Sequence, residues 1–294
     1  MLYFIDNKRI INTEYDILLL YNAIIFMNLF KEKYAESIQD TSKYWSDIAR
    51  SKIDWFTPFT TVQSGSFIQG DIAWFLNGKL NVCYNAVDRW CIHPHNHRID
   101  DVAILWEGDE PTDVRKITYG ELLHNVCRIA NALKAQGVQK GDVVTIYIPM
   151  IPEIAMTMLA CARIGAIHSV VFGGFSSDAI AERVVASSSK WVITADGGKR
   201  GGKFLPLKTV CDSALAKDAC KAVVQKVFVF KHHNDGSVIM FPDRDIDFNE
   251  LIQAQRPYCP CEVMDSEDNL FILYTSGSTG RPVRFIFYCV ILMK

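Results

Sequence analysis

The segment Tyr274-Thr275-Ser276-Gly277-Ser278-Thr279-Gly280-Arg281-Pro282 places four hydroxyl side chains and two glycines within six residues, 275–280. The apolar run from Leu270 to Tyr274 leads into this segment and predicts a buried strand. Glycines let a ligand approach the backbone closely, and consecutive N–H groups together with Ser and Thr hydroxyls form a concavity for anions. Arg281 adds a permanent positive charge whose planar donors suit phosphate. The segment therefore predicts a phosphate-binding loop that follows a strand.

The alternative interpretation of this segment is a flexible Ser/Gly linker. A linker rarely follows a hydrophobic strand and rarely ends in a basic residue before proline, so we favour the phosphate loop. The segment is not a Walker A loop, because the Gly-Lys-Ser/Thr ending is absent.

Upstream of the loop, strand and helix patterns alternate along the chain. Thr118 and Glu121 form a capping box before a helical pattern, and Gly137 follows that pattern where a cap glycine belongs. The expected strands are 103–106, 143–148, 166–172, 191–194 and 226–230, and the expected helices are 122–133, 152–164, 178–186 and 206–219. This alternation predicts an α/β fold with a parallel sheet that helices cover on both faces.

A second segment with possible binding chemistry is Thr194–Lys203, which interleaves three cations with four glycines. It follows an expected strand, and ligands gather where parallel strands end. Phosphate contact and a solvated basic hairpin explain this segment equally well. Gly173-Gly174 also follows a strand, and a tight strand-to-helix turn explains it fully.

Composition is that of an ordinary globular protein, with 294 residues, 49% hydrophobic and 22% charged. The net charge of −2 favours neither nucleic acid nor an anionic membrane surface as a partner. Nine cysteines are an odd number and form no C-x-x-C pair, which predicts a reduced, cytosolic setting. The apolar run 17–30 is too short for a membrane span and is a poor secretory signal.

Two short segments could bind a metal by composition alone, Cys259-Pro-Cys261 and His93-Pro94-His95-Asn96-His97. We assign no metal site to either, because the first lacks a second Cys/His pair nearby and the second is more typical of a solvated loop. The pair His232-His233 is expected at the surface, in a polar loop.

The phosphate loop, with a basic residue and Pro after it, resembles that of the adenylate-forming (AMP-binding) enzymes. The run Trp74-Phe75-Leu76-Asn77-Gly78-Lys79-Leu80-Asn81-Val82, followed by Tyr84-Asn85 and Asp88-Arg89, resembles the N-terminal cap of the acetyl-CoA synthetase family. The resemblance covers roughly 34–282. It implies 34–95 as the cap and 96–283 as the N-terminal part of an AMP-binding domain, with 1–33 an extension of unclear status.

The resemblance implies an acetate–CoA ligase that makes acetyl-AMP from acetate and ATP and then passes the acetyl group to coenzyme A, with Mg²⁺. It implies no nucleic-acid or membrane partner and leaves the oligomeric state open. We expect a cytoplasmic location, and a mitochondrial or nuclear one is left open. It implies an ATP phosphate loop and coenzyme A contacts, at Thr275, Ser276, Gly277, Ser278, Thr279, Gly280 and Arg281, and at Arg200, Gly201, Gly202 and Lys203, with Gly173 and Gly174. No catalytic residue and no metal ligand is assigned.

The sequence departs from the family after the loop, where Val283 replaces a basic residue and an apolar segment, 284–294, ends the chain. We expect a truncated domain that is inactive by itself. We also expect the segment 284–294 to be foreign to the fold, since nothing in the chain could bury it on both faces. Alternatives are an inactive chain that binds nucleotide or coenzyme A, and part of a propionate–CoA ligase.

Overall fold

The protein is described by a computed structural model that defines residues 14–92, 97–233, 236, 238–276 and 282–289. The chain divides into two compact units, Met1–Ile53 and Asp54–Lys294. The first unit contains helices α1 (Glu14–Gln39) and α2 (Thr41–Lys52), and the Asp40 carboxylate caps α2 by accepting the N–H of Lys43. Within the described residues, no helix is both long enough and apolar enough to cross a membrane.

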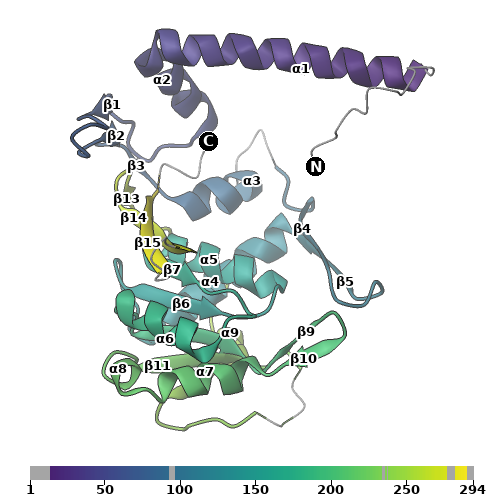
Figure 1. The fold of residues 1–294 in the computed structure, drawn as a ribbon, viewed down its shortest axis with the longest axis vertical. Coiled ribbons are helices and arrows are strands. Elements are labelled where there is room, and N and C mark those ends of the chain that lie inside the picture. Colours follow the sequence, from purple (N-terminus) through teal and green to yellow (C-terminus); the bar gives the residue numbers. More distant parts are fainter. Residues whose placement is uncertain (1–13, 93–96, 234–235, 237, 277–281, 290–294) are drawn as a thin grey trace. The chain divides into compact units, whose positions relative to one another are not determined.

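A seven-stranded sheet organises the second unit, and Figure 1 shows its strands between two groups of helices. The strand order is β12-β11-β8-β6-β7-β14-β15. All neighbours pair in parallel except β14 and β15, which are antiparallel. The bounds are β6 Val143–Tyr147, β7 Ile167–Val170, β8 Trp191–Ala195, β11 Lys226–Phe230, β12 Asp245–Asp247, β14 Asn269–Ser276 and β15 Pro282–Tyr288.

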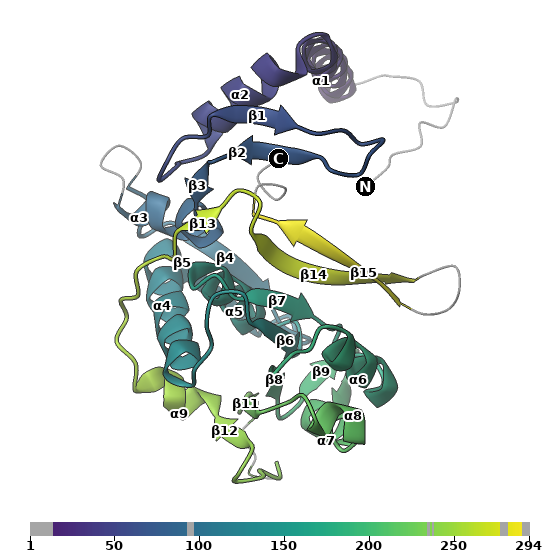
Figure 2. The same ribbon diagram turned by 90° about the vertical axis from the view of Figure 1, so that its left-hand side faces the viewer.

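Helices cover both faces of this sheet, as the strand–helix alternation predicts. The helices α4 (Tyr119–Ala135), α5 (Pro152–Arg163) and α9 (Phe248–Gln253) lie on one face, and α6 (Ser177–Ala186), α7 (Leu207–Leu215) and α8 (Asp218–Lys221) lie on the other (Figure 2). The central strands β6, β8 and β11 are rich in β-branched and aromatic residues and are almost entirely buried.

The helix boundaries follow the capping signals in the sequence. Thr118 and Glu121 form the reciprocal capping box of α4, and Gly137 beyond its end has a φ of 92°. Ser176 caps α6, and α5 begins at Pro152. The prediction of a single helix over 206–219 is wrong, because this segment forms two helices, α7 and α8. Lys217 between them has an extended backbone, and its ammonium pairs with Asp178 of α6.

An irregular layer precedes the sheet in the second unit. It consists of β1 (Thr61–Ser64), β2 (Ala73–Leu76), β3 (Lys79–Leu80), the π-helical turn η1 (Tyr84–Asp88) and α3 (Arg89–Ile92). Phe75 packs against the rings of Trp55 and Phe59, with centroids 5.8 and 4.9 Å away. The predicted turn at Asn77-Gly78 is confirmed, since Asn77 has a φ of 66°. Strand β3 pairs with the distant β13 (Met264–Asp265) and so anchors this layer.

The apolar segment at the end of the described chain forms strand β15. All seven residues of β15 pair with β14, and Phe287 stacks on Phe271 with ring centroids 4.5 Å apart. One partner strand is thus available to this segment. Phe285, Ile286 and Tyr288 are nevertheless 48%, 38% and 37% exposed, so much of its apolar surface faces solvent at the sheet edge.

Candidate ligand-binding site

A cavity of about 640 Å³ lies where four parallel strands end. Pro149–Ile151 follow β6, Phe172–Gly174 follow β7, Lys199 and Arg200 come after β8, and His232 with His233 follows β11. Leu205 and Leu207 also line the cavity, and a further wall is the hairpin of β4 (Val102–Glu107) and β5 (Val114–Thr118), which contributes Trp106, Glu107, Gly108, Asp109, Glu110 and Asp113. The carboxyl edge of a parallel sheet is the usual ligand position in this class of fold.

The two glycines after β7 and the arginine after β8, predicted from separate segments, meet in this cavity. A Cβ atom on Gly174 would lie 3.3 Å from Nη1 of Arg200 and 3.1 Å from the Phe172 ring. The Arg200 guanidinium lies over that ring, 5.0 Å from its centroid. A side chain at position 174 would therefore push against Arg200, so glycine permits the guanidinium to lie there.

The basic segment after β8 is a hairpin of β9 (Gly198–Arg200) and β10 (Lys203–Leu205). Its two-residue turn is Gly201-Gly202, whose φ angles of 56° and 71° favour glycine. Arg200 lines the cavity, and so does Lys199, which the sequence analysis did not assign as a contact. Among the described residues that line the cavity Lys203 does not appear; it is exposed on the hairpin.

The backbone of the Gly201-Gly202 turn already holds an anion from the chain itself. The N–H of Gly201 donates to Oδ1 of Asp109 at 2.9 Å, and the N–H of Gly202 donates to Oδ2 at 2.7 Å. These bonds, with a smaller contribution from Lys199, hold the pKa of Asp109 below its usual range. Sequence reasoning missed Asp109, because nothing local links it to a turn 92 residues later.

The histidine pair lies at the cavity rather than in a remote surface loop. Asp196, which follows β8, accepts the backbone N–H groups of His232 and His233, both at 2.9 Å, and so ties the ends of β8 and β11 together. His232 is exposed and His233 is half-buried. Within the part of the chain that is described, Nε2 of His233 is buried without a hydrogen-bond partner, next to the ring of Phe204. Partial desolvation at the cavity, and next the neighbouring His233, lower the pKa of His232.

Strand β14 leads to the predicted phosphate loop, as expected. Leu270, Phe271 and Ile272 are buried, whereas Leu273 is 42% exposed, so the strand is buried only in part. Thr275 is exposed, Ser276 ends the strand, and the residues Gly277, Ser278, Thr279, Gly280 and Arg281 lie outside the described part of the chain. Because β14 runs parallel to β7, its carboxyl end reaches the same edge of the sheet as Gly173-Gly174.

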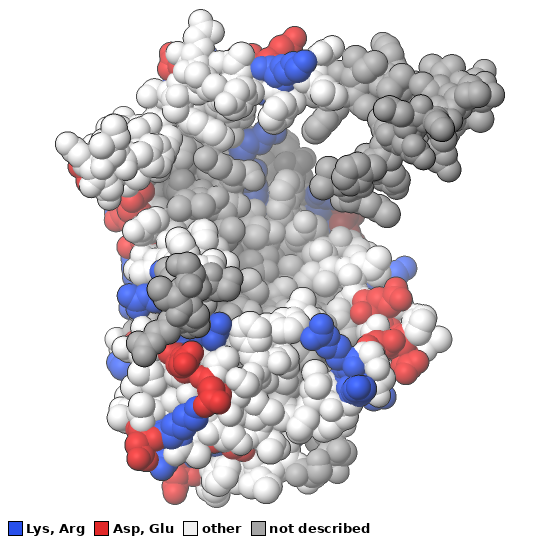
Figure 3. All heavy atoms as spheres, viewed as in Figure 1, with Lys and Arg blue, Asp and Glu red and all other residues white. Residues whose placement is uncertain are grey.

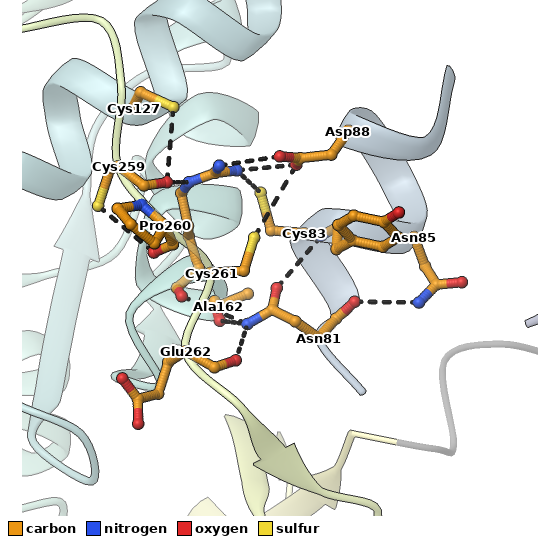
Figure 4. Close-up of polar contacts among 12 residues, drawn as sticks. Asn81, Cys83, Asn85, Asp88, Cys127, Ala162, Cys259, Pro260, Cys261 and Glu262 are labelled. Carbon is orange, nitrogen blue, oxygen red and sulfur yellow. Dashed lines mark hydrogen bonds and ion pairs between the residues drawn. The ribbon is translucent and has the colours of Figure 1, made fainter. Parts of the chain in front are cut away.

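The Cys259-Pro-Cys261 segment packs around a buried ion pair rather than forming a recognisable metal site. The guanidinium of Arg163, at the end of α5, donates to the Asp88 carboxylate and to the carbonyl of Cys259, as Figure 4 shows. It also contacts the Cys83 sulfur at 3.4 Å. No group of three His, Cys, Asp or Glu residues suits a metal ion anywhere in the described residues, and His93–Asn96 lie outside them.

All nine cysteines are free, and eight of them are buried. Burial raises the pKa of the Cys161 and Cys211 thiols to about 12 and that of the Cys127 thiol to about 11. These thiols therefore stay protonated at neutral pH and are poor nucleophiles.

Comparisons with known proteins identify two family regions in the chain. A family described as "AMP-binding enzyme" matches residues 92–282, and one described as "Acetyl-coenzyme A synthetase N-terminus" matches residues 30–86. The chain is 54% identical over 255 residues to the acetyl-coenzyme A synthetase of Syntrophobacter fumaroxidans, covering 86% of this chain and 38% of that protein. It is 51% identical over 255 residues to the acetyl-coenzyme A synthetase of Cryptosporidium parvum, covering 86% of this chain and 35% of that protein.

The fold also matches that of a solved structure, the acetoacetyl-CoA synthetase from Streptomyces lividans. The TM-score is 0.76 at 23% identity, over 87% of this chain and 38% of that one. The similarity supports the α/β fold with a mostly parallel sheet. The chain thus spans somewhat more than a third of the length of the relatives that it matches.

Proposed function

Because the chain belongs to the AMP-binding enzyme family and carries the N-terminal region of acetyl-coenzyme A synthetases, we propose that it supplies the coenzyme A site and the ATP phosphate loop of an AMP-forming acetate–CoA ligase. In the reaction of such a ligase, an acetate oxygen attacks the α-phosphate of ATP, giving acetyl-AMP and pyrophosphate. The coenzyme A thiol then attacks the acetyl carbonyl and AMP leaves. The residues of this chain act by binding and positioning.

The observation that carries the proposal is the meeting of Gly173, Gly174 and Arg200 in one cavity at the carboxyl edge of the sheet. The glycines let the ligand approach the backbone closely. The Arg200 guanidinium lies over the Phe172 ring, and its planar fork can donate two parallel bonds to the 3′-phosphate of coenzyme A. Lys199 at the cavity and Lys203, exposed at the start of β10, add positive charge, but an ammonium lacks the planar donor fork of a guanidinium.

The loop from Thr275 to Arg281 is proposed to bind the β- and γ-phosphates of ATP, and Mg²⁺ to arrive with the nucleotide. Strand β14, which precedes this loop in the sequence, runs parallel to β7 and ends at the same edge of the sheet as Gly173-Gly174, and this supports the assignment. A net charge of −2 fits a protein that acts on small molecules, and nine free cysteines fit a reducing compartment. We propose that this compartment is the cytosol.

The proposal is tested by the affinity of the 294-residue chain for coenzyme A and for 3′-dephospho-coenzyme A, measured by isothermal calorimetry at fixed ionic strength. We expect coenzyme A to bind on the order of tenfold or more tightly, the scale of one or more charge-assisted hydrogen bonds. Equal affinities would contradict the assignment of the cationic hairpin to the 3′-phosphate.

A further inference from the structure

The carboxylate of Asp109 is bonded to the turn of the cationic hairpin in the manner of a bound oxyanion. Its two oxygens accept the N–H groups of Gly201 and Gly202, one each, at 2.9 and 2.7 Å. Both glycines have positive φ angles, so the two N–H groups point to the same side of the turn and form a small anion-binding nest. Two oxygens of a phosphate would fit the same pair of donors.

The two partners come from separate hairpins. Asp109 lies in the loop between β4 and β5, and the glycines lie between β9 and β10, 92 residues later. Figure 3 shows negative side chains over the first hairpin beside positive side chains over the second. The charged residues that line the cavity are Glu107, Asp109, Glu110, Asp113, Lys199 and Arg200. Carboxylates thus outnumber cations among these lining residues, and the Asp109 carboxylate bonds to the turn of the cationic hairpin.

We propose that Asp109 occupies the anion nest of the cationic hairpin and is displaced by the phosphate of the ligand. Asp109 thereby selects ligands whose negative charge exceeds that of a carboxylate. This inference rests on the proposed function, since it concerns the same site. It adds a specificity-determining residue that lies outside the segments predicted to bind. A phosphate monoester carries between one and a half and two negative charges at neutral pH, about twice the charge of a carboxylate. It can therefore replace the carboxylate, whereas a neutral or singly charged group gains little by doing so.

The competing explanation is that Asp109 only braces the hairpin. The two explanations predict opposite results when the carboxylate is removed. If Asp109 competes with the ligand, the Asp109→Asn chain loses the competing negative charge and one of the two acceptor oxygens, so it binds coenzyme A more tightly, on the order of tenfold. If Asp109 braces the hairpin, the same change loosens the turn and weakens binding.

The experiment measures calorimetric affinities of the wild-type chain and of Asp109→Asn for coenzyme A, 3′-dephospho-coenzyme A and inorganic pyrophosphate. Glu110→Gln is the matched control, because it removes one negative charge from the same cavity without touching the turn. We expect Asp109→Asn to tighten coenzyme A and pyrophosphate binding and to leave 3′-dephospho-coenzyme A unchanged, with a much smaller gain for Glu110→Gln. Amide NMR signals of Gly201 and Gly202 should shift on ligand binding, which reports the nest directly.

Each outcome separates this inference from the proposed function. Unchanged or weaker coenzyme A binding by Asp109→Asn, with the wild-type preference for the 3′-phosphate intact, overturns the role of Asp109 and leaves the proposed function standing. An equal gain in Glu110→Gln overturns it too, because general electrostatics would then explain the effect. Tighter pyrophosphate binding in Asp109→Asn, with no coenzyme A binding in either chain, supports the displacement and contradicts the coenzyme A assignment.

Discussion

Arg163 and Asp88 form a bidentate ion pair, with Nη1–Oδ2 and Nη2–Oδ1 distances of 2.8 and 2.9 Å, in a part of the second unit where both side chains are nearly inaccessible. Arg163 ends α5, and Asp88 ends the π-helical turn η1, so the pair joins the irregular N-terminal layer to the helices of the sheet domain. The Cys259 carbonyl accepts the remaining Nε–H. The guanidinium is therefore held by two segments that are far apart in sequence.

Removing one partner of this pair should destabilise the fold strongly. Asp88→Asn leaves the Arg163 charge buried without its carboxylate, and loss of one partner of a buried pair costs about 3–5 kcal/mol. Urea unfolding followed by tryptophan fluorescence measures the change. Asp101→Asn is the control, because it breaks the exposed Arg98–Asp101 pair and should leave the midpoint unchanged. Similar midpoints for the two variants would show that the buried pair contributes little.

Stability should fall as pH is lowered from about 6.5 toward 4, because of His168 in β7. Burial lowers the pKa of His168 to about 4, so the folded protein keeps this imidazole neutral while the unfolded chain binds a proton below its ordinary pKa, about 6.5. The unfolded state thus binds more protons across this window, and stability is lost as pH falls through it. Complete loss corresponds to about 3 kcal/mol, at about 1.4 kcal/mol for each pH unit.

The measurement for His168 is the urea-unfolding free energy between pH 7 and pH 4 for the wild-type chain and for His168→Gln. The variant removes the titrating group, so its stability should depend less steeply on pH, whatever its stability at pH 7. His124→Gln, at an exposed position of α4, is the matched control and should keep the wild-type slope. An unchanged slope in His168→Gln would show that other groups cause the pH dependence.

Most of the sheet could be predicted from the sequence because its signals are local. Capping residues such as Thr118 and Ser176, and the buried runs of β6, β8 and β11, determine their own elements. The break between α7 and α8, where Lys217 has an extended backbone, was missed. Helical periodicity continues across that break, so no local pattern marks it.

The candidate site could be predicted only in part for the same reason. Gly173-Gly174 and the hairpin at 198–205 each show a turn pattern, and strand topology brings them together. The positions of Asp109 and of the histidine pair depend on tertiary contacts, with the turn at Gly201-Gly202 and with Asp196. An exposed carboxylate in a loop is common, and only its partners distinguish this one.

The two glycines after β7 should respond differently to alanine. A Cβ on Gly174 meets the Arg200 guanidinium and the Phe172 ring, which can move aside, so Gly174→Ala should fold normally but displace Arg200. A Cβ on Gly173 lies 3.2 Å from the Ile148 carbonyl oxygen, so Gly173→Ala presses on backbone and should lower stability by about 1 kcal/mol or more. Thermal unfolding and coenzyme A affinity, measured on both variants, separate the effects. Unimpaired coenzyme A binding by Gly174→Ala would contradict the role given to the Arg200 position.

Arg200 itself should carry the largest share of phosphate recognition. Arg200→Ala removes a guanidinium that lies over the Phe172 ring at the cavity, and we expect coenzyme A binding to weaken by about 1.5–3 kcal/mol, the range of charge-assisted hydrogen bonds. Arg200→Lys keeps the charge but loses the fork, so it should recover only part of the affinity. Affinity for 3′-dephospho-coenzyme A should change little in either variant.

The matched control for Arg200 is Lys203→Ala, which removes a cation from the same hairpin at a residue that is exposed. If affinity followed total charge alone, both alanine variants would weaken coenzyme A binding equally and would show the same salt dependence. Both residues are exposed, so a geometric role for Arg200 requires a larger loss than in Lys203→Ala that persists at high ionic strength, because a guanidinium with two direct N–H bonds to a phosphate is screened less than an ammonium that acts from a distance. In a full-length ligase that contains this chain, Arg200→Ala should slow the coenzyme A-dependent step and leave acetate-dependent pyrophosphate exchange into ATP nearly unchanged. Loss of that exchange would place Arg200 in the first half-reaction instead.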